Sequence, residues 1–246
     1  MANSVTHFAA KDQSSAAFFK TPTATAIWNV LDRAHKKMSL AAIIGAAGTG
    51  KTTTALAFAA QNRDVRVMQA SIRVRAPMQL VRELARLYGL EHVRVTYLFE
   101  EIISVMSGFL IVDEAHLLTD PAIELLRGLN DPLPGRNKIG VALIGNPVLI
   151  GNREGQNRPL NAQFLSRIEP YLIIDEPLAE DYDEFFDAHK IAGARSRKLI
   201  QEAAYRRAGA LRTAAKIIAC ARELAGDQAI GMGHIEQAIE FLGYGR

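Results

Sequence analysis

Apolar runs recur along this chain and alternate with stretches of helical spacing. Short, nearly continuous apolar runs occur at residues 40–44, 109–112, 139–144 and 171–174, and a further strand pattern at 65–70. Such runs are typical of strands buried on both faces of a parallel sheet. Between them, apolar residues recur every three or four positions, as on one face of a helix. This alternation favours an α/β fold in which helices flank a parallel sheet.

Prolines mark where several of the predicted helices begin. Pro22, Pro77 and Pro121 each stand at the start of a helical pattern, and Thr21 could cap the first of these helices. Proline is favoured in the first turn because it has no N–H group to leave unpaired. Further helices are predicted over residues 53–60, 95–106 and 163–168.

The pattern changes after Pro177, where strand-like runs stop. From there to residue 242 the apolar residues keep a helical spacing, which predicts a small all-helical bundle of the size of a lid. The predicted organisation is a flexible tail over residues 1–17, an α/β nucleotide-binding core over 18–176 and a helical lid domain over 177–246.

A phosphate-binding pattern follows the first apolar run. It reads G-x-x-x-x-G-K-T, the P-loop motif, and stands between a strand and a helix as that motif requires. Its glycines allow the backbone to wrap closely around a polyphosphate, and the helix N-terminus adds partial positive charge. Lys51 is expected to reach the β- and γ-phosphates of ATP, and Thr52 to ligate Mg²⁺. The predicted nucleotide contacts are Gly45, Ala46, Ala47, Gly48, Thr49, Gly50, Lys51, Thr52 and Thr53.

Polar side chains end two later strands. Asp113 and Glu114 follow the run at 109–112, and we expect Asp113 to hold Mg²⁺ and Glu114 to deprotonate the attacking water. An acidic pair after a strand is by itself weak evidence for a Mg²⁺ and catalytic site. The P-loop upstream makes that evidence strong. Asn146 ends the run at 139–144, where its amide could bond the γ-phosphate or the water. An ordinary asparagine turn before Pro147 is the alternative.

Composition narrows the class of protein. Of 246 residues, 49% are hydrophobic and 22% charged, which suits a substantial core. The net charge of +3 permits DNA binding without requiring it. Cys220 is the single cysteine, so no intrachain disulfide can form. Neither a membrane-length apolar run nor a signal-peptide pattern occurs, so we predict no membrane association and a cytoplasmic location, in a bacterial or phage-infected cell.

The order of motifs resembles that of the AAA+ ATPases. After the P-loop come Asp113-Glu114, Asn146, Ser166-Arg167 and Gly209-Ala210-Leu211-Arg212. The resemblance implies that Asn146 is sensor 1, that Arg167 is an arginine finger acting on a neighbouring subunit, and that Arg212 is sensor 2. Arg153 and Arg158 compete for the finger role, and a surface ion pair with Glu169 is the plain alternative for Arg167.

Within that class, the chain looks like the target-capture ATPases of DNA transposition. The stretches that carry this likeness are residues 110–116, 142–146 and 162–168. The resemblance implies a homo-oligomer, a helical filament or ring, that forms with ATP on double-stranded DNA. It also implies a DDE transposase as partner, which stimulates hydrolysis, and hydrolysis then dissolves the oligomer. The phage protein that typifies the group has an extra N-terminal helix-turn-helix domain, and no function of that domain is carried over here.

Basic residues in three places are the predicted contacts to DNA phosphates. They lie after the second strand, in a Pro/Gly loop and in the helical lid: Arg73, Arg75, Arg136, Lys138, Arg195, Arg197 and Lys198. Around the start of the lid, residues 175–187 hold seven acids and no base, whereas residues 190–222 inside it hold nine bases and one acid. Solvated helix faces explain that segregation as readily as a binding surface does.

Four other interpretations are weaker or remain open. Residues 113–116 spell D-E-A-H, but helicases with that box need two motor domains. A secretion-type AAA+ ATPase would normally carry an apolar span. A catalytically idle switch conflicts with the intact Lys51, Asp113 and Glu114. A replication initiator or helicase loader is the main alternative, and its partner would distinguish it.

Overall fold

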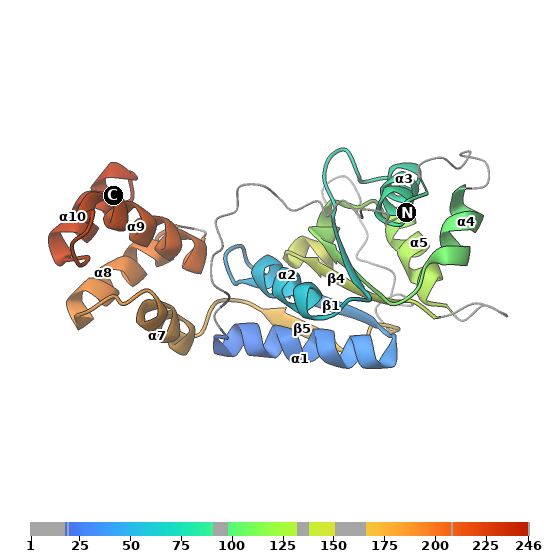
Figure 1. Ribbon diagram of the computed structural model, residues 1–246, viewed down its shortest axis with the longest axis horizontal. Helices are drawn as coiled ribbons and strands as arrows, with labels where there is room; N and C mark the ends of the chain where they lie inside the picture. The colour runs from blue at the N-terminus through green and yellow to red at the C-terminus, as the bar shows by residue number, and fades with distance from the viewer. Residues whose placement is uncertain are drawn as a thin grey trace, which may run out of the picture.

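A parallel sheet lies at the centre of the computed structural model, which describes residues 18, 20–90, 98–131, 138–150, 166–207 and 209–245 (Figure 1). Its strands are β1 (Leu40–Gly45), β2 (Val65–Gln69), β3 (Phe109–Asp113), β4 (Gly140–Gly145) and β5 (Tyr171–Ile174). Their order across the sheet is β2-β3-β4-β1-β5, and every neighbouring pair is parallel. The predicted α/β fold is therefore confirmed.

Helices cover both faces of this sheet. One face packs against α1 (Pro22–Lys37) and α2 (Lys51–Gln61), and the other against α3 (Pro77–Leu87), α4 (Leu98–Val105) and α5 (Asp120–Asn130). Side chains alternate along a strand, so β1 gives Ala41 and Ile43 to the first core and Leu40, Ala42 and Ile44 to the second. This double burial explains why the strands read as continuous apolar runs.

The predicted helix starts at Pro22, Pro77 and Pro121 are confirmed, since each proline occupies the first turn of its helix. Some boundaries differ from the prediction. The P-loop helix begins at Lys51, two residues early, because the loop feeds directly into it. Residues 166–167 form a turn instead of the predicted helix, whose residues 163–165 lie outside the described part of the chain. Residues 95–97 of another predicted helix also lie outside it.

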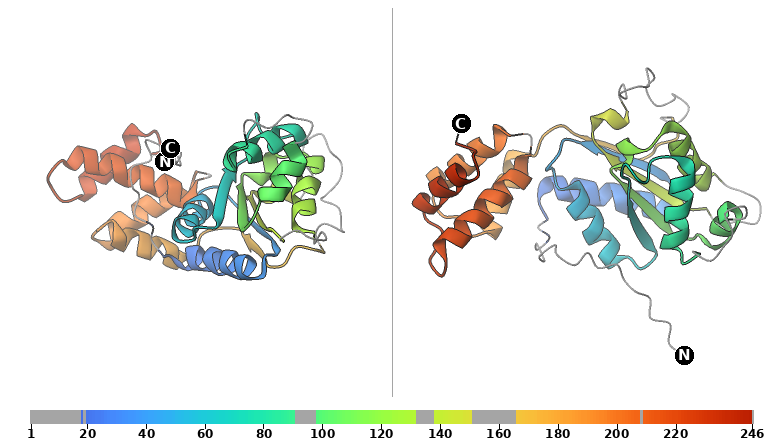
Figure 2. Two further views of the ribbon diagram at one scale, coloured as in Figure 1. Left: turned by 45° about the vertical axis from the view of Figure 1, so that its right-hand side comes forward. Right: turned by 90° about the horizontal axis from the view of Figure 1, so that it is seen from above.

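Four C-terminal helices form a bundle around a core of their own. They are α7 (Ala179–Ala188), α8 (Ala194–Tyr205), α9 (Ala210–Ala225) and α10 (Met232–Phe241). Tyr182, Ile200, Ile217 and Ile235 lie at the centre of this core. Figure 2 shows the bundle to one side of the sheet. In the part of the chain described, no helix has the length and apolarity needed to cross a membrane. The proposed boundary at residue 177 stays a prediction.

Asp181 joins this bundle to the start of α1. Its carboxylate is fully buried and accepts hydrogen bonds from the Thr23 backbone N–H at 2.8 Å and the Thr23 hydroxyl at 2.5 Å. It also accepts from the Leu178 N–H at 2.7 Å. Both N–H groups lie at helix N-termini, where no intrahelical acceptor is available. One carboxylate therefore satisfies the starts of α1 and α7 together.

Asp181→Ala is expected to lower the free energy of unfolding by about 2–4 kcal/mol, because it leaves buried donors unpaired at both helix starts. Urea denaturation followed by circular dichroism would measure the change. Asp183→Ala removes an exposed acid from the same helix and is the matched control, expected to change stability by less than about 0.5 kcal/mol. Equal effects of the two variants would contradict this role of Asp181.

Candidate nucleotide-binding site

The P-loop connects β1 to α2 at the carboxyl edge of the sheet. Gly48 and Gly50 have φ angles of 82° and 85°, a left-handed conformation that glycine adopts without a steric penalty. The Lys51 ammonium lies over the loop and donates to the carbonyl oxygens of Gly45 at 2.8 Å and Ala46 at 2.7 Å. Burial lowers the pKa of Lys51, while the charges of Asp113 and Glu114 raise it and that of Arg212 lowers it further.

The carboxylate of Asp113 meets the first turn of α2. The Thr52 hydroxyl donates to Asp113 Oδ2 at 2.7 Å, and the Glu114 N–H donates to Asp113 Oδ1 at 2.9 Å. Glu114 itself has a φ of 54°, a left-handed conformation that is uncommon for a residue with a side chain and recurs at functional sites. Its Oε2 lies 3.3 Å from His116 Nδ1. The fold thus unites P-loop and acidic pair, which the sequence separates.

The chemistry of these oxygens suits Mg²⁺. A hydroxyl and a carboxylate already in contact, Thr52 Oγ1 and Asp113 Oδ2, are hard ligands of the kind that Mg²⁺ prefers. The described residues contain no cluster of three or more His, Cys, Asp or Glu side chains placed to hold a metal. Mg²⁺ in nucleotide sites takes most remaining ligands from water and phosphates, so two protein oxygens fit it.

A cavity of about 590 Å³ opens above these groups, between the sheet and the helical bundle. Its lining includes most of the predicted catalytic residues: Lys51, Asp113, Glu114, Asn146 and Arg212. The Asn146 Oδ1 accepts from the Val148 N–H at 3.0 Å, so this residue forms the asparagine turn given as the alternative, and it also lines the cavity. Eight of the nine predicted nucleotide contacts line the same cavity, all except Ala46.

Aromatic rings also line the cavity. Phe18 contributes from the N-terminal segment, and its ring also packs 5.8 Å from that of Trp28, so it is both cavity wall and core anchor. Phe185 comes from α7 and His189 is the residue that ends it, with ring centroids 4.5 Å apart. Burial lowers the pKa of His189, and the nearby charge of Arg222 lowers it further. Phe185, His189 and His116 were not predicted from the sequence. The four-residue spacing of Phe185 and His189, which places both on one side of a helical turn, could have indicated the first two.

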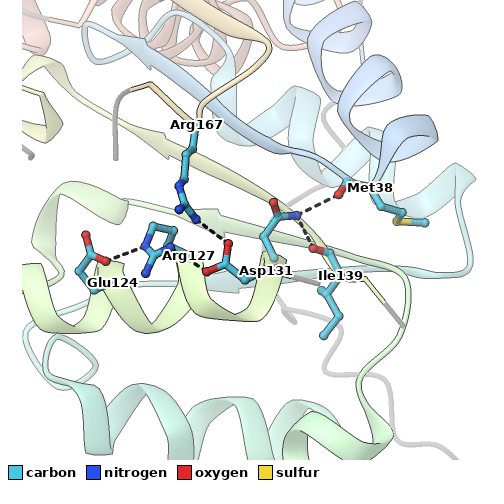
Figure 3. Close-up of polar contacts among 7 residues, drawn as sticks. Met38, Glu124, Arg127, Asp131, Ile139 and Arg167 are labelled. Atoms are coloured by element: carbon cyan, nitrogen blue, oxygen red, sulfur yellow. Dashed lines mark hydrogen bonds and ion pairs between the residues drawn. The ribbon is translucent and has the colours of Figure 1, made fainter. Parts of the chain in front are cut away.

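Arg167 lies away from this cavity. Figure 3 shows Asp131, at the end of α5, held between two arginines: Arg167 donates to its Oδ1 and Arg127 to its Oδ2, each at 2.7 Å. The surface ion pair expected as the alternative therefore exists, but its acid is Asp131 and not Glu169, which pairs with Arg33 at 3.2 Å. The Arg167 side chain stays 53% exposed. The rival fingers, Arg153 and Arg158, lie outside the described residues.

The predicted DNA contacts do not form one surface. Arg73 and Arg75 are exposed after the carboxyl end of β2, whereas Lys138 precedes the amino end of β4, at the opposite edge of the sheet. In the bundle, Arg197 pairs with Asp187 and donates to the Ile191 carbonyl, so it is partly neutralised. Arg195 and Lys198 belong to the same helix, α8, and Arg136 lies outside the described residues.

The helical bundle touches the P-loop directly. A Cβ atom added to Gly48 would lie 1.9 Å from the Gly209 carbonyl oxygen, so only glycine permits this approach. Gly209 is the N-cap of α9, whose first turn carries Arg212 into the cavity. The predicted lid therefore reaches the phosphate-binding loop through the segment that carries the sensor 2 candidate.

Gly48→Ala is expected to destabilise the nucleotide-free protein by at least about 1 kcal/mol more than Gly50→Ala. Both positions carry the left-handed penalty, but a Cβ on Gly50 meets nothing within 4 Å. The difference therefore isolates the contact with Gly209. Thermal unfolding without nucleotide measures it, and equal losses in the two variants would show that the bundle does not rest on the P-loop.

The sequence of this chain is similar to those of known proteins. A model of the AAA domain family matches residues 34–151. The chain is 28% identical over 201 residues to the ATP-dependent target DNA activator B of Escherichia phage Mu, and 27% identical over 201 residues to that of Escherichia phage D108. Each match covers 79% of this chain and 63% of the relative, so the chain spans under two thirds of the length of these relatives.

Solved structures support the same fold. The structure of Cdc6p from Pyrobaculum aerophilum superposes with a TM-score of 0.71, covering 93% of this chain and 69% of that one at 18% identity. At that identity the likeness concerns the fold alone. This fold and the match of the AAA domain model to residues 34–151 agree with each other and are consistent with ATPase activity.

Proposed function

We propose that this protein is an ATP-dependent DNA-binding ATPase. The proposal is based on its match to the AAA domain family and its similarity to the phage target DNA activators. It oligomerises on double-stranded DNA as a filament or ring and delivers that target DNA to a DDE transposase. ATP hydrolysis then drives disassembly. The observation that carries the proposal is the cavity in which Lys51, Asp113 and Glu114 meet Arg212 of the helical bundle.

The residues around the cavity divide the chemistry among them. Lys51 would turn from the loop carbonyls to the β- and γ-phosphates, where its charge is needed. Thr52 and Asp113 would hold Mg²⁺, which supplies positive charge at the phosphates when bound. Glu114 would take the proton of the attacking water. Asn146, whose amide oxygen is already bonded, would donate from its nitrogen to the γ-phosphate or the water.

Assembly follows from the position of Arg167. Its half-exposed side chain pairs with Asp131 and does not line the cavity of its own chain, which supports a contact with the γ-phosphate of a neighbouring subunit. An arginine supplied in this way stabilises charge in the transition state. ATP between subunits would then favour the oligomer, and hydrolysis would weaken it. Because Gly209 of the helical bundle contacts the P-loop, a change of the bound nucleotide would also be transmitted to the lid.

A replication initiator or helicase loader is the second candidate, because the placement of Gly209 and Arg212 at the start of a helix of the bundle resembles that branch of the AAA+ ATPases. Both candidates bind duplex DNA with ATP, in the cytoplasm. Their partners differ, since one acts with a transposase and the other with a helicase. Pull-down of each purified partner class with the DNA-bound protein would separate them.

Electron microscopy with duplex DNA tests the proposal most directly. Samples would contain either ADP or a slowly hydrolysed ATP analogue. Filaments or rings on DNA only with the analogue are expected, because the nucleotide bridges subunits and Arg167 senses its γ-phosphate. Lys51→Ala is the control and should give no assembly in either state. Failure of the unaltered protein to bind DNA with either nucleotide would contradict the proposal.

A further inference from the structure

Asp131 stands at the C-terminal end of α5, where a helix disfavours negative charge. The carbonyl groups exposed at such an end carry partial negative charge, which disfavours a nearby carboxylate. Asp131 is nevertheless the C-cap residue of α5, and its side chain is only partly exposed. Helix stability therefore gives no reason for an acid here. What the position provides is contact with two arginines, Arg127 and Arg167 (Figure 3).

A chain of charges along α5 fixes the Asp131 carboxylate. Arg127 donates from Nη1 to Asp131 Oδ2 and from Nε to Glu124 Oε2, each at 2.7 Å. Spacings of three and four residues place Glu124, Arg127 and Asp131 on one face of the helix. The carboxylate that Arg167 contacts is therefore held by a partner on its own helix.

Arg167 lies near the amino edge of the sheet, opposite the cavity of its own chain. The Glu169 N–H, two residues further on, donates at 2.8 Å to the carbonyl of Leu40, the first residue of β1. At the same edge the Asn130 amide donates at 2.7 Å to the carbonyl of Ile139, just before β4. The P-loop leaves the other end of β1, a strand of six residues that spans roughly 17 Å. Both sides of the Asp131–Arg167 contact are thus anchored far from that loop.

The Arg167 guanidinium keeps donors for a second anion. Its Nη1 bonds to Asp131 Oδ1 at 2.7 Å, and within the described part of the chain its Nε and Nη2 bond to no other group. A guanidinium carries five N–H donors in one plane, so one edge can bind a carboxylate while another binds a phosphate. Because Asp131 shares its charge with Arg127, it does not cancel that of Arg167. A long, half-exposed side chain is thereby held in one orientation.

We infer that Asp131, itself held by Arg127, is the positioning residue of Arg167. It keeps the guanidinium in one orientation at the subunit surface before a neighbour arrives, so that assembly brings an already aligned cation to the neighbour's ATP. Alignment in advance lowers the entropy lost at the transition state, and a small misplacement of such a group can cost about 10²-fold in rate. The inference rests on the proposed function and adds what aligns the arginine.

Asp131→Asn tests this role while keeping the shape of the side chain. One uncharged carbonyl oxygen replaces a carboxylate that accepts from two arginines. The kcat of the protein assembled on duplex DNA is expected to fall about tenfold, with ATP affinity and assembly unchanged. Asp131→Ala, which removes the acceptor, should lose about 10²-fold. Asp32→Asn is the matched control, because Asp32 is equally exposed and paired with Lys36, and it should leave kcat unchanged.

Two further measurements separate positioning from a structural role. In an Arg167→Ala background, Asp131→Asn should cause no further loss of turnover, because no guanidinium remains to be aligned. Glu114→Gln subunits lack the general base but keep both Asp131 and Arg167. Mixed with them, Asp131→Asn subunits should regain turnover, because their own cavities are intact and receive a correctly held arginine.

The outcomes distinguish this inference from the proposed function. If the unaltered protein neither assembles on DNA nor hydrolyses ATP, the proposed function fails and this inference fails with it. If it does both and Asp131→Asn behaves like Asp32→Asn, only the positioning role is wrong. Faster hydrolysis in Asp131→Asn would show that Asp131 masks the arginine, which overturns the inference. A further loss in the Arg167→Ala background, or no recovery in the mixture, would assign Asp131 to the structure of its own subunit.

Discussion

Arg167→Ala is expected to slow ATP hydrolysis in the assembled protein by about 10³–10⁵-fold while leaving ATP binding intact. The loss is large because the guanidinium stabilises charge that develops only in the transition state. ATP binding survives because Arg167 does not line the cavity of its own chain. Phosphate release at saturating DNA, with nucleotide affinity measured separately, distinguishes the two effects.

Mixing subunits tests whether this arginine acts on a neighbour. An Arg167→Ala subunit keeps an intact cavity, and a Lys51→Ala subunit keeps an intact arginine, so a mixture should recover part of the activity that each lacks alone. Arg33→Ala removes another half-exposed, ion-paired arginine and is the control, expected to hydrolyse ATP normally. Normal turnover of Arg167→Ala in the oligomer would assign the finger to a different arginine.

Glu114→Gln is expected to reduce turnover by about 10²–10⁴-fold and to trap ATP in DNA-bound oligomers. Glutamine keeps the shape of the side chain but cannot accept the proton of the attacking water. The backbone N–H of residue 114 still donates a hydrogen bond to the Asp113 carboxylate, so the cavity and the cation ligands are preserved. The variant should therefore assemble at least as well as the unaltered protein.

Two measurements check this expectation. Phosphate release gives the loss of turnover, and dissociation from DNA after dilution gives the lifetime of the oligomer. Glu100→Gln changes an exposed acid of α4 in the same chemical way and should leave both unchanged. Unchanged turnover in Glu114→Gln would remove Glu114 as the general base.

The sequence by itself determined the features that depend on neighbouring residues. The P-loop was recognisable because its glycines, Lys51 and Thr52 act as one continuous segment between a strand and a helix. The strands were recognisable because burial on both faces demands an unbroken apolar run. The order of the motifs also led to the fold class, which the sheet and the AAA domain confirm.

Only the tertiary structure decided which distant residues meet. No spacing pattern predicts that Asp131 holds Arg167, that Asp181 joins the starts of two helices, or that Gly48 admits the carbonyl of Gly209. It also placed Arg73 and Lys138 at opposite edges of the sheet, although both had been predicted to contact DNA phosphates. These contacts arise from the packing of whole elements, whose relative positions depend on the summed burial of many side chains and not on any local sequence signal.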